Sequence, residues 1–230
     1  MADRTHDPID RQYRAFIETT YSPIPKDEFE KIVDNILTLI EMGHDKKQPL
    51  KSTLDFAAKM IFKLFDFHEI GVGLKDRKDG TYRYEVMFGF RKEVEENFRK
   101  LRYTYEDMVS NERFPFIRIG RLSELDPVEG LPEWEHDLFN RPYQLNVPRK
   151  TPDEFHEGDY IDVWMYSNNR EIIGWFELAG TPTDKLPSRN QMRWIEVIVG
   201  ICSSIVAEKW SEEDATSSRL QFAQSPTRPR

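Results

Sequence analysis

Two stretches close to residue 170 alternate apolar side chains with aromatic and acidic ones. Residues 160–166 read Tyr-Ile-Asp-Val-Trp-Met-Tyr, and residues 171–178 read Glu-Ile-Ile-Gly-Trp-Phe-Glu-Leu. Successive side chains of an extended chain point to opposite faces of a sheet. We expect one set to face a hydrophobic core: Ile161, Val163, Met165, Ile172, Gly174, Phe176 and Leu178. The opposite face should then gather Tyr160, Asp162, Trp164, Tyr166, Trp175 and Glu177.

Aromatic rings beside carboxylates favour a cationic ligand. The ring face attracts a cation through its quadrupole, and the acids add opposite charge. An amine or quaternary ammonium ion is therefore the sharpest ligand hypothesis. Arg118, on a further predicted strand, would bind an anion or balance Asp162. The candidate ligand-binding residues are Arg118, Asp162, Trp164, Tyr166, Trp175 and Glu177.

Ordinary packing is an alternative reading of the same residues. The aromatic face could lie beneath a long loop, with Asp162 or Glu177 paired to Arg118 or capping that loop. The sequence leaves both readings open, and it does not identify a cofactor.

Other chemistry-bearing residues fit no known signature. The loop residues His136, Asp137, His156, Glu157 and Asp159 match neither zinc nor non-haem iron spacing, so we predict no metal site. No serine or cysteine lies in a nucleophile-elbow context, and we predict no catalytic site. A small enzyme of unknown reaction remains the weakest alternative, because catalytic groups meet only in space.

Two further features have simple structural readings. Gly71 and Gly73 lie on a predicted strand that does not open a helix, so close packing explains them better than a dinucleotide site. Cys202 lies on the apolar face of a predicted helix and should be a small buried hydrophobe.

The elements around the aromatic face form a hairpin and a long helix. Asn168-Asn169 should form the tight turn between the two strands, because Asn tolerates the left-handed conformation. A helix should begin after Ser188, whose side chain and that of Gln191 can form a capping box, and should run to about Lys209. Its apolar residues recur at helical spacing, so one face should pack against the sheet.

The preceding chain alternates helices and strands. Helical periodicity predicts helices over 27–42, ended by Gly43, and over 50–65. Residues 68–74 and 82–90 should form a hairpin around Asp79-Gly80, followed by a helix over 93–108 and a strand over 114–121. Residues 122–157 read as one long irregular connection.

This order predicts an α+β domain with a central antiparallel sheet. The N- and C-terminal helices should cover one face, and the long loop and helix region should cover the other. We expect an N-terminal arm over 1–25 with at most a short helix near Arg11 to Glu18, one domain over 26–210, and a disordered tail over 211–230.

The C-terminal half resembles a GAF domain. The similar segments are Gly158-Asp159-Tyr160, the strand from Ile172 to Ala179 with its Ile-Gly step, the helix start Leu186-Pro-Ser-Arg-Asn-Gln191, and the closing helix through Ile195 and Glu208. Residues 50–90 are similar to the opening helix and hairpin of that family, which has a GAF/PAS-like sheet. The resemblance covers roughly Pro25 to Trp210 and rests on pattern rather than on invariant residues.

The resemblance implies a sensory or regulatory module. Such a module binds a small molecule on one side of its sheet and forms a homodimer through its first and last helices. The sequence lacks the Asn-Lys…Phe…Asp-Glu signature of cyclic-nucleotide binders and has one cysteine, Cys202, in the closing helix. Cyclic-nucleotide binding, bilin attachment and methionine sulfoxide reduction are therefore disfavoured.

Charge and composition exclude several classes of partner. The 230 residues carry a formal net charge of -8 and a pI near 5.3, which argues against nucleic acid. No run of about 18 apolar residues and no apolar signal core is present, so we expect a cytoplasmic protein without membrane contact.

The leading hypothesis is a small-molecule-binding regulatory module that signals to a separate signalling or enzyme partner, because no output sequence motif is visible. A ligand-free interaction or scaffold subunit is the alternative.

Overall fold

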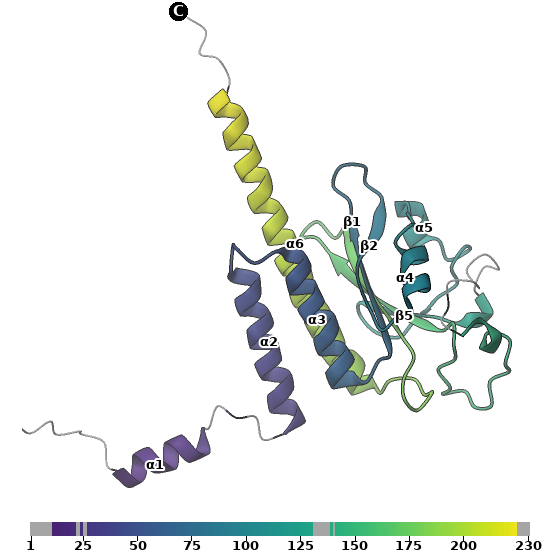
Figure 1. Cartoon of the computed structure of the whole chain (residues 1–230), viewed down its shortest axis with the longest axis horizontal. Helices are drawn as coiled ribbons and strands as arrows, with labels where there is room; N and C mark the ends of the chain where they lie inside the picture. The colour runs from purple at the N-terminus through teal and green to yellow at the C-terminus, as the bar shows by residue number, and fades with distance from the viewer. Residues whose placement is uncertain (1–10, 22–23, 25–26, 131–138, 140, 225–230) are drawn as a thin grey trace, which may run out of the picture.

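A six-stranded antiparallel sheet forms the centre of the molecule. The computed structural model describes residues 11–21, 24, 27–130, 139 and 141–224 (Figure 1). The strand order is β2-β1-β6-β5-β4-β3, and every neighbouring pair is antiparallel. The strands are β1 (Glu69–Lys75), β2 (Tyr82–Phe88), β3 (Ile117–Arg118), β4 (Ser123–Asp126), β5 (Tyr160–Tyr166) and β6 (Ile172–Ala179).

Long helices cover one face of this sheet and short ones the other. Figure 1 shows α2 (Glu28–His44), α3 (Leu50–Phe65) and α6 (Arg189–Gln224) on one side, and α4 (Lys92–Phe98) and α5 (Tyr105–Val109) on the other. Two single-turn helices, Val128–Gly130 and Pro142–Gln144, interrupt the loop before β5. The α+β architecture predicted from the sequence is confirmed.

The helix start predicted at Ser188 is confirmed, and α2 also has a capped start. Asp27 caps α2 by accepting a hydrogen bond from the backbone N–H of Glu30 at 2.8 Å. At the start of α6, the backbone N–H of Gln191 donates to Ser188 Oγ, and the Ser188 N–H donates to Gln191 Oε1. These bonds satisfy N–H groups that have no partner within the helix. The short arm helix is also present as α1 (Arg11–Thr20).

Two hydrophobic cores lie on opposite faces of the sheet. Ile161, Val163 and Met165 of β5 join the core under the long helices, whereas Trp164 and Trp175 join a second cluster beneath α4 and α5. The predicted division of β5 is therefore confirmed. Ile172 was assigned to the wrong face. A bulge next to Tyr166 shifts the register, so Ile172 joins the aromatic cluster and Ile173 faces the long helices.

Several predicted boundaries were wrong because long-range contacts decide them. Gly43 lies inside α2, which ends at His44. The predicted helix over 93–108 is two helices, because Tyr103 pairs with the backbone of Tyr82 as an isolated bridge. A capping box of Thr104 and Asp107 then starts α5.

Strand β4 lies inside the stretch that was predicted to be irregular. Ser123–Asp126 pair with β5 on one side and with β3 on the other. The predicted strand over 114–121 is reduced to Ile117–Arg118. A strand of four residues shows too few alternations of apolar and polar side chains for its sequence to be distinguished from a loop.

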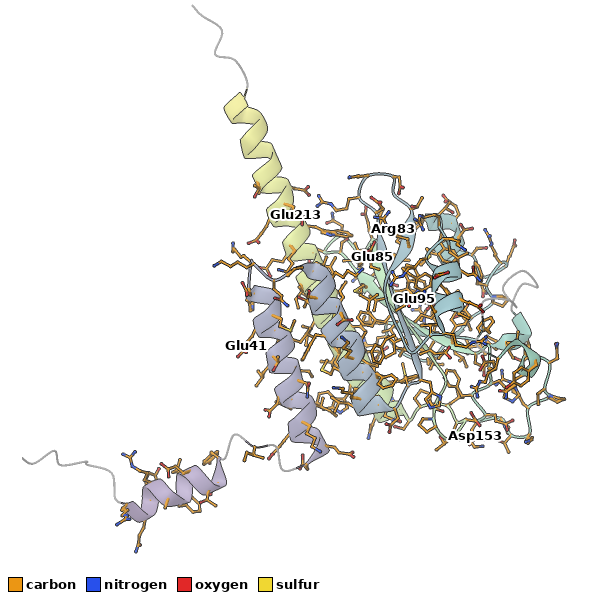
Figure 2. All side chains as sticks on the ribbon, viewed as in Figure 1. Glu41, Arg83, Glu85, Glu95, Asp153 and Glu213 are labelled. Atoms are coloured by element: carbon orange, nitrogen blue, oxygen red, sulfur yellow. The ribbon has the colours of Figure 1, made fainter. Side chains whose placement is uncertain are left out.

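Helix α6 extends well past its predicted end. It continues to Gln224, so residues 211–224 are helical rather than a disordered tail. The segment contains no glycine or proline. Its acidic side chains also form ion pairs with residues from earlier in the chain: Glu212 pairs with Lys46, while Glu213 and Asp214 pair with Arg77. Figure 2 labels Glu213 where α6 leaves the helical layer. Among the described residues, no helix is long and apolar enough to cross a membrane.

Candidate ligand-binding cavity

The aromatic face of β5 and β6 forms the floor of a cavity. Antiparallel pairing places Trp164 opposite Trp175 and Asp162 opposite Glu177. Both indoles are almost completely buried, with 6% of Trp164 and 2% of Trp175 exposed. The structure therefore brings four of the six predicted site residues, Asp162, Trp164, Trp175 and Glu177, into the lining of one cavity.

Two glycines of β1 make room for this floor. Gly73 pairs with Trp175, and a Cβ atom added to Gly73 would lie 2.0 Å from the Trp175 ring. A Cβ atom on Gly71 would lie 2.8 Å from the ring of Tyr84. The Gly-x-Gly pair is the close-packing feature that the sequence predicted, because any side chain there would displace an aromatic ring.

Rings from β2, α4 and the following loops build the walls. Tyr84 meets Trp175 edge-on with ring centroids 5.0 Å apart, and it meets Phe98 in the same manner at 5.1 Å. Such edge-to-face contacts fix the orientation of each ring. The aromatic lining comprises Tyr84, Phe98, Tyr103, Phe114, Phe116, Phe139, Tyr160, Trp164 and Trp175.

The polar groups of the lining are predominantly acidic. Five carboxyl groups reach the cavity, those of Asp107, Glu124, Asp126, Asp162 and Glu177. No lysine, arginine or histidine of the described chain lines it. The interior open to water is about 60 Å³. One water needs roughly 10–15 Å³ by this measure, so the space suits a ligand of a few heavy atoms.

Glu177 is one of the buried acids of this lining. Tyr84 Oη donates a hydrogen bond of 2.5 Å to Glu177 Oε2. Burial raises the pKa of the Glu177 carboxyl to about 7, and the charge of Glu69 adds to that effect, while hydrogen bonds from Tyr84 and Trp175 oppose it. Burial also raises the pKa of Tyr84 well above its usual range. A proton on Glu177 is therefore exchangeable near neutral pH.

Glu124 was missed in the sequence because β4 was missed. Trp164 Nε1 donates to Glu124 Oε2 at 2.9 Å, and Arg118 Nη2 donates to Glu124 Oε1 at 2.6 Å. Glu124 thus orients one indole of the floor and is itself held by a cation outside. The acidic alternation of residues 123–126 before Pro127 was the available signal.

Arg118 and Tyr166 lie outside the cavity. Arg118 faces Glu124 across the β3–β4 pair rather than Asp162, and 63% of its side chain is exposed. Tyr166 follows the bulge of β5 and lines a separate groove, although it packs against the aromatic cluster. The expectation that Arg118 balances Asp162 is wrong, because the antiparallel register places Glu124 closer.

The loop acids considered as metal ligands are engaged in ion pairs. Arg149 bonds to buried Asp159 at 2.6 Å, Arg141 bonds to Glu157 at 2.8 Å, and His156 lies 3.1 Å from Glu154. His136 and Asp137 lie outside the described residues. Within the described residues, no three histidine, cysteine or acidic side chains are gathered as a metal ion would require.

Comparison with solved structures identifies the fold. The GAF domain/HD domain protein of Geobacter sulfurreducens superposes with a TM-score of 0.51 at 16% identity, over 75% of this chain and 97% of that one. The GAF domain of a phosphoenolpyruvate-protein phosphotransferase of Coxiella burnetii gives 0.50 at 8% identity, over 80% and 96% of the two chains. The chain has a GAF-like fold.

A bacteriophytochrome of R. palustris is also similar. It gives a TM-score of 0.51 at 14% identity, over 86% of this chain and 42% of that one. No family model matches the sequence, and no curated protein matches it. The cavity lies on the face of the sheet opposite the core under the long helices, because Trp164 and Trp175 of its lining belong to the second cluster.

Proposed function

We propose that this protein is a sensory or regulatory GAF-like module whose cavity binds a small cation, an amine or a quaternary ammonium ion. The composition of the cavity carries the proposal. Its described lining combines nine aromatic rings and five carboxyl groups with no basic side chain. The same lining disfavours phosphate-bearing and carboxylate ligands, which would be repelled.

Physical chemistry favours a cation in this setting. A desolvated cation–ring contact contributes about 2 kcal/mol, and the two buried indoles can each supply one. Asp162 and Glu177 form the cross-strand pair two residues along the same strands and offer opposite charge. A bound cation also lowers the cost of burying their negative charge.

Signal transfer would run through β5 into α6. The backbone N–H of Tyr166 donates to Ser203 Oγ at 2.8 Å, and Ser203 Oγ donates to the Tyr166 carbonyl at 2.6 Å. A ligand that displaces β5 therefore acts on α6 directly. Phe29 and Leu37 of α2 are more than half exposed, which supports a homodimer through the terminal helices and a separate partner. Native mass spectrometry tests the dimer: two chains are expected, and a monomer throughout the concentration range would contradict it.

Isothermal calorimetry with a matched pair of probes tests ligand choice. Choline and its neutral isostere 3,3-dimethylbutan-1-ol have similar shape and differ in charge. We expect choline to bind and to raise the melting temperature, because a ligand at 100 times its Kd contributes about 2.7 kcal/mol of stability. The alcohol should bind at least tenfold more weakly. Equal binding of the two probes, or binding of neither, would overturn the cation proposal.

Two variants connect such binding to the cavity. Trp164→Ala removes one ring of the floor and Glu177→Gln removes one charge, and each should weaken choline binding by roughly tenfold or more. Trp210→Phe is the control, because Trp210 lies on α6 and contacts Arg77 rather than the cavity. Binding unchanged in the first two variants would place the ligand elsewhere.

A ligand-free interaction subunit is the second candidate. The exposed apolar residues Phe29 and Leu37 of α2 favour it, because a partner that covered them would remove apolar surface from water. This candidate differs from the first in one expected result: the Trp164→Ala variant should bind its partner protein as well as the wild type does.

A further inference from the structure

Three arginines from three separate elements line one surface groove. Arg121 lies in the turn between β3 and β4, Arg170 in the turn between β5 and β6, and Arg193 on α6. All three residues are exposed. In the described part of the chain, no carboxylate forms an ion pair with any of these three guanidinium groups.

This arrangement differs from the rest of the described surface. Most other arginines of the domain are held in ion pairs: Arg77, Arg83, Arg99, Arg113, Arg118, Arg141 and Arg149. The whole chain carries a formal net charge of -8. Three like charges that share a groove repel one another and lower stability, whereas an anion from outside would relieve the repulsion.

The one carboxylate of the described chain that lines the groove, that of Glu196, holds a neighbouring turn in place. Glu196 of α6 is buried, and its Oε1 accepts hydrogen bonds from Leu122 N at 2.7 Å and from Ser123 Oγ at 2.9 Å. A Cβ atom on Gly120 would lie 2.1 Å from the same oxygen. Glu196 therefore fixes the turn that carries Arg121, and its Oε1 is engaged in hydrogen bonds within the protein.

Apolar side chains line the groove together with the arginines. Leu122 and Val197 line it, and Val197 is 47% exposed. A small-molecule site normally encloses most of its ligand, whereas here the cations stand exposed at the rim of an open surface. The guanidinium group of arginine can donate two parallel hydrogen bonds to one carboxylate. Leu122 and Val197 suit an aliphatic or aromatic side chain of the same ligand.

We propose that this groove docks an acidic segment of a partner protein, one in which carboxylates flank an apolar side chain. The assignment adds a second site to the molecule and does not depend on ligand binding in the cavity. The two sites share β5: Trp164 N donates to the Leu122 carbonyl at 2.8 Å, and Tyr166 lines the groove while packing against the aromatic cluster.

Fluorescence anisotropy with defined probes tests the docking site. The probe is a fluorescein-labelled peptide that alternates glutamate with leucine, and the comparison probes are the same peptide with glutamine in place of glutamate and a single-stranded RNA of equal length. We expect the acidic peptide to bind and to weaken as NaCl is raised, because the contacts are exposed ion pairs. Preference for the glutamine peptide or for RNA, or no binding of the acidic peptide, would overturn the proposal.

Charge-altered variants locate the binding. The double substitution Arg170→Glu with Arg193→Glu should weaken the acidic peptide at least roughly tenfold, and the neutral pair Arg170→Gln with Arg193→Gln should fall between it and the wild type. Lys51→Glu on α3 is the matched control, because Lys51 is exposed and does not line the groove. A graded loss with an unchanged melting temperature supports the site. Equal affinity in all four proteins would contradict it, whether or not choline binds the cavity.

Discussion

At the residue scale, Glu177 links the cavity to pH. Burial of its carboxyl favours retention of a proton up to about pH 7, and the hydrogen bond donated by Tyr84 opposes this effect. A cationic ligand requires the deprotonated form. Binding of a cation should therefore release a proton near neutral pH, so that its affinity depends on pH.

The first prediction concerns stability without ligand. Because the pKa of Glu177 is raised from 4.5 to about 7 on folding, the folded state binds more protons than the unfolded state between these values. The free energy of unfolding should fall as the pH rises from about 4.5 to about 7, by up to ~3 kcal/mol, and should then level off. Urea unfolding at a series of pH values measures this fall in the free energy of unfolding.

Glu177→Gln provides the control for this slope. The amide keeps an acceptor for Tyr84 and does not titrate in this range. The variant should lose most of the decline between pH 4.5 and 7. An identical slope in both proteins would show that other groups cause it.

Residue types also set the limit of what the sequence could predict here. The two-residue period of β5 placed Asp162 and Trp164 on the correct face, because alternation depends only on extended backbone. Arg118 was paired with the wrong acid, because its partner follows from the register of β3 against β4, which no local pattern encodes.

At the element scale, the close approach of β1 to the rings on β6 and β2 positions the floor of the cavity. Gly73 lies beneath the Trp175 ring, and Gly71 lies beneath Tyr84. Substitution here tests the floor without changing any polar group.

Gly73→Ala should destabilise the protein by about 1–3 kcal/mol, because the added methyl group overlaps the Trp175 ring and forces it to move. Choline affinity should fall with it. Gly200→Ala is the matched control, since nothing lies within 4 Å of its added Cβ atom and alanine favours a helix by up to about 1 kcal/mol. Chemical denaturation compares the two, and a neutral Gly73→Ala would mean that the ring is not confined.

Elements with strong local signals were predictable, and those decided by distant contacts were not. Capping residues and periodicity gave α2, α3 and the start of α6 closely. The split between α4 and α5 depends on Tyr103 meeting Tyr82, and the face of Ile172 depends on a bulge. The far half of α6 depends on Arg77 and Lys46, which come from other parts of the chain.

At the scale of the whole molecule, the two faces of the sheet have different roles. The long helices on one face bury the main core and expose apolar residues of α2, whereas the other face encloses an acidic aromatic cavity. The arginine groove lies where β3, β4, β5 and α6 meet, beside both. The overall class of fold followed from element order alone, but the cavity followed only once β4 supplied Glu124 and Asp126.

Native mass spectrometry of the protein purified from cells tests the central claim most directly. We predict particles that carry extra mass, which denaturation releases as a small molecule bearing a positive charge and which Trp164→Ala does not retain. An anionic or neutral molecule released in its place, or bare polypeptide mass that choline does not change, would contradict a cation-binding cavity.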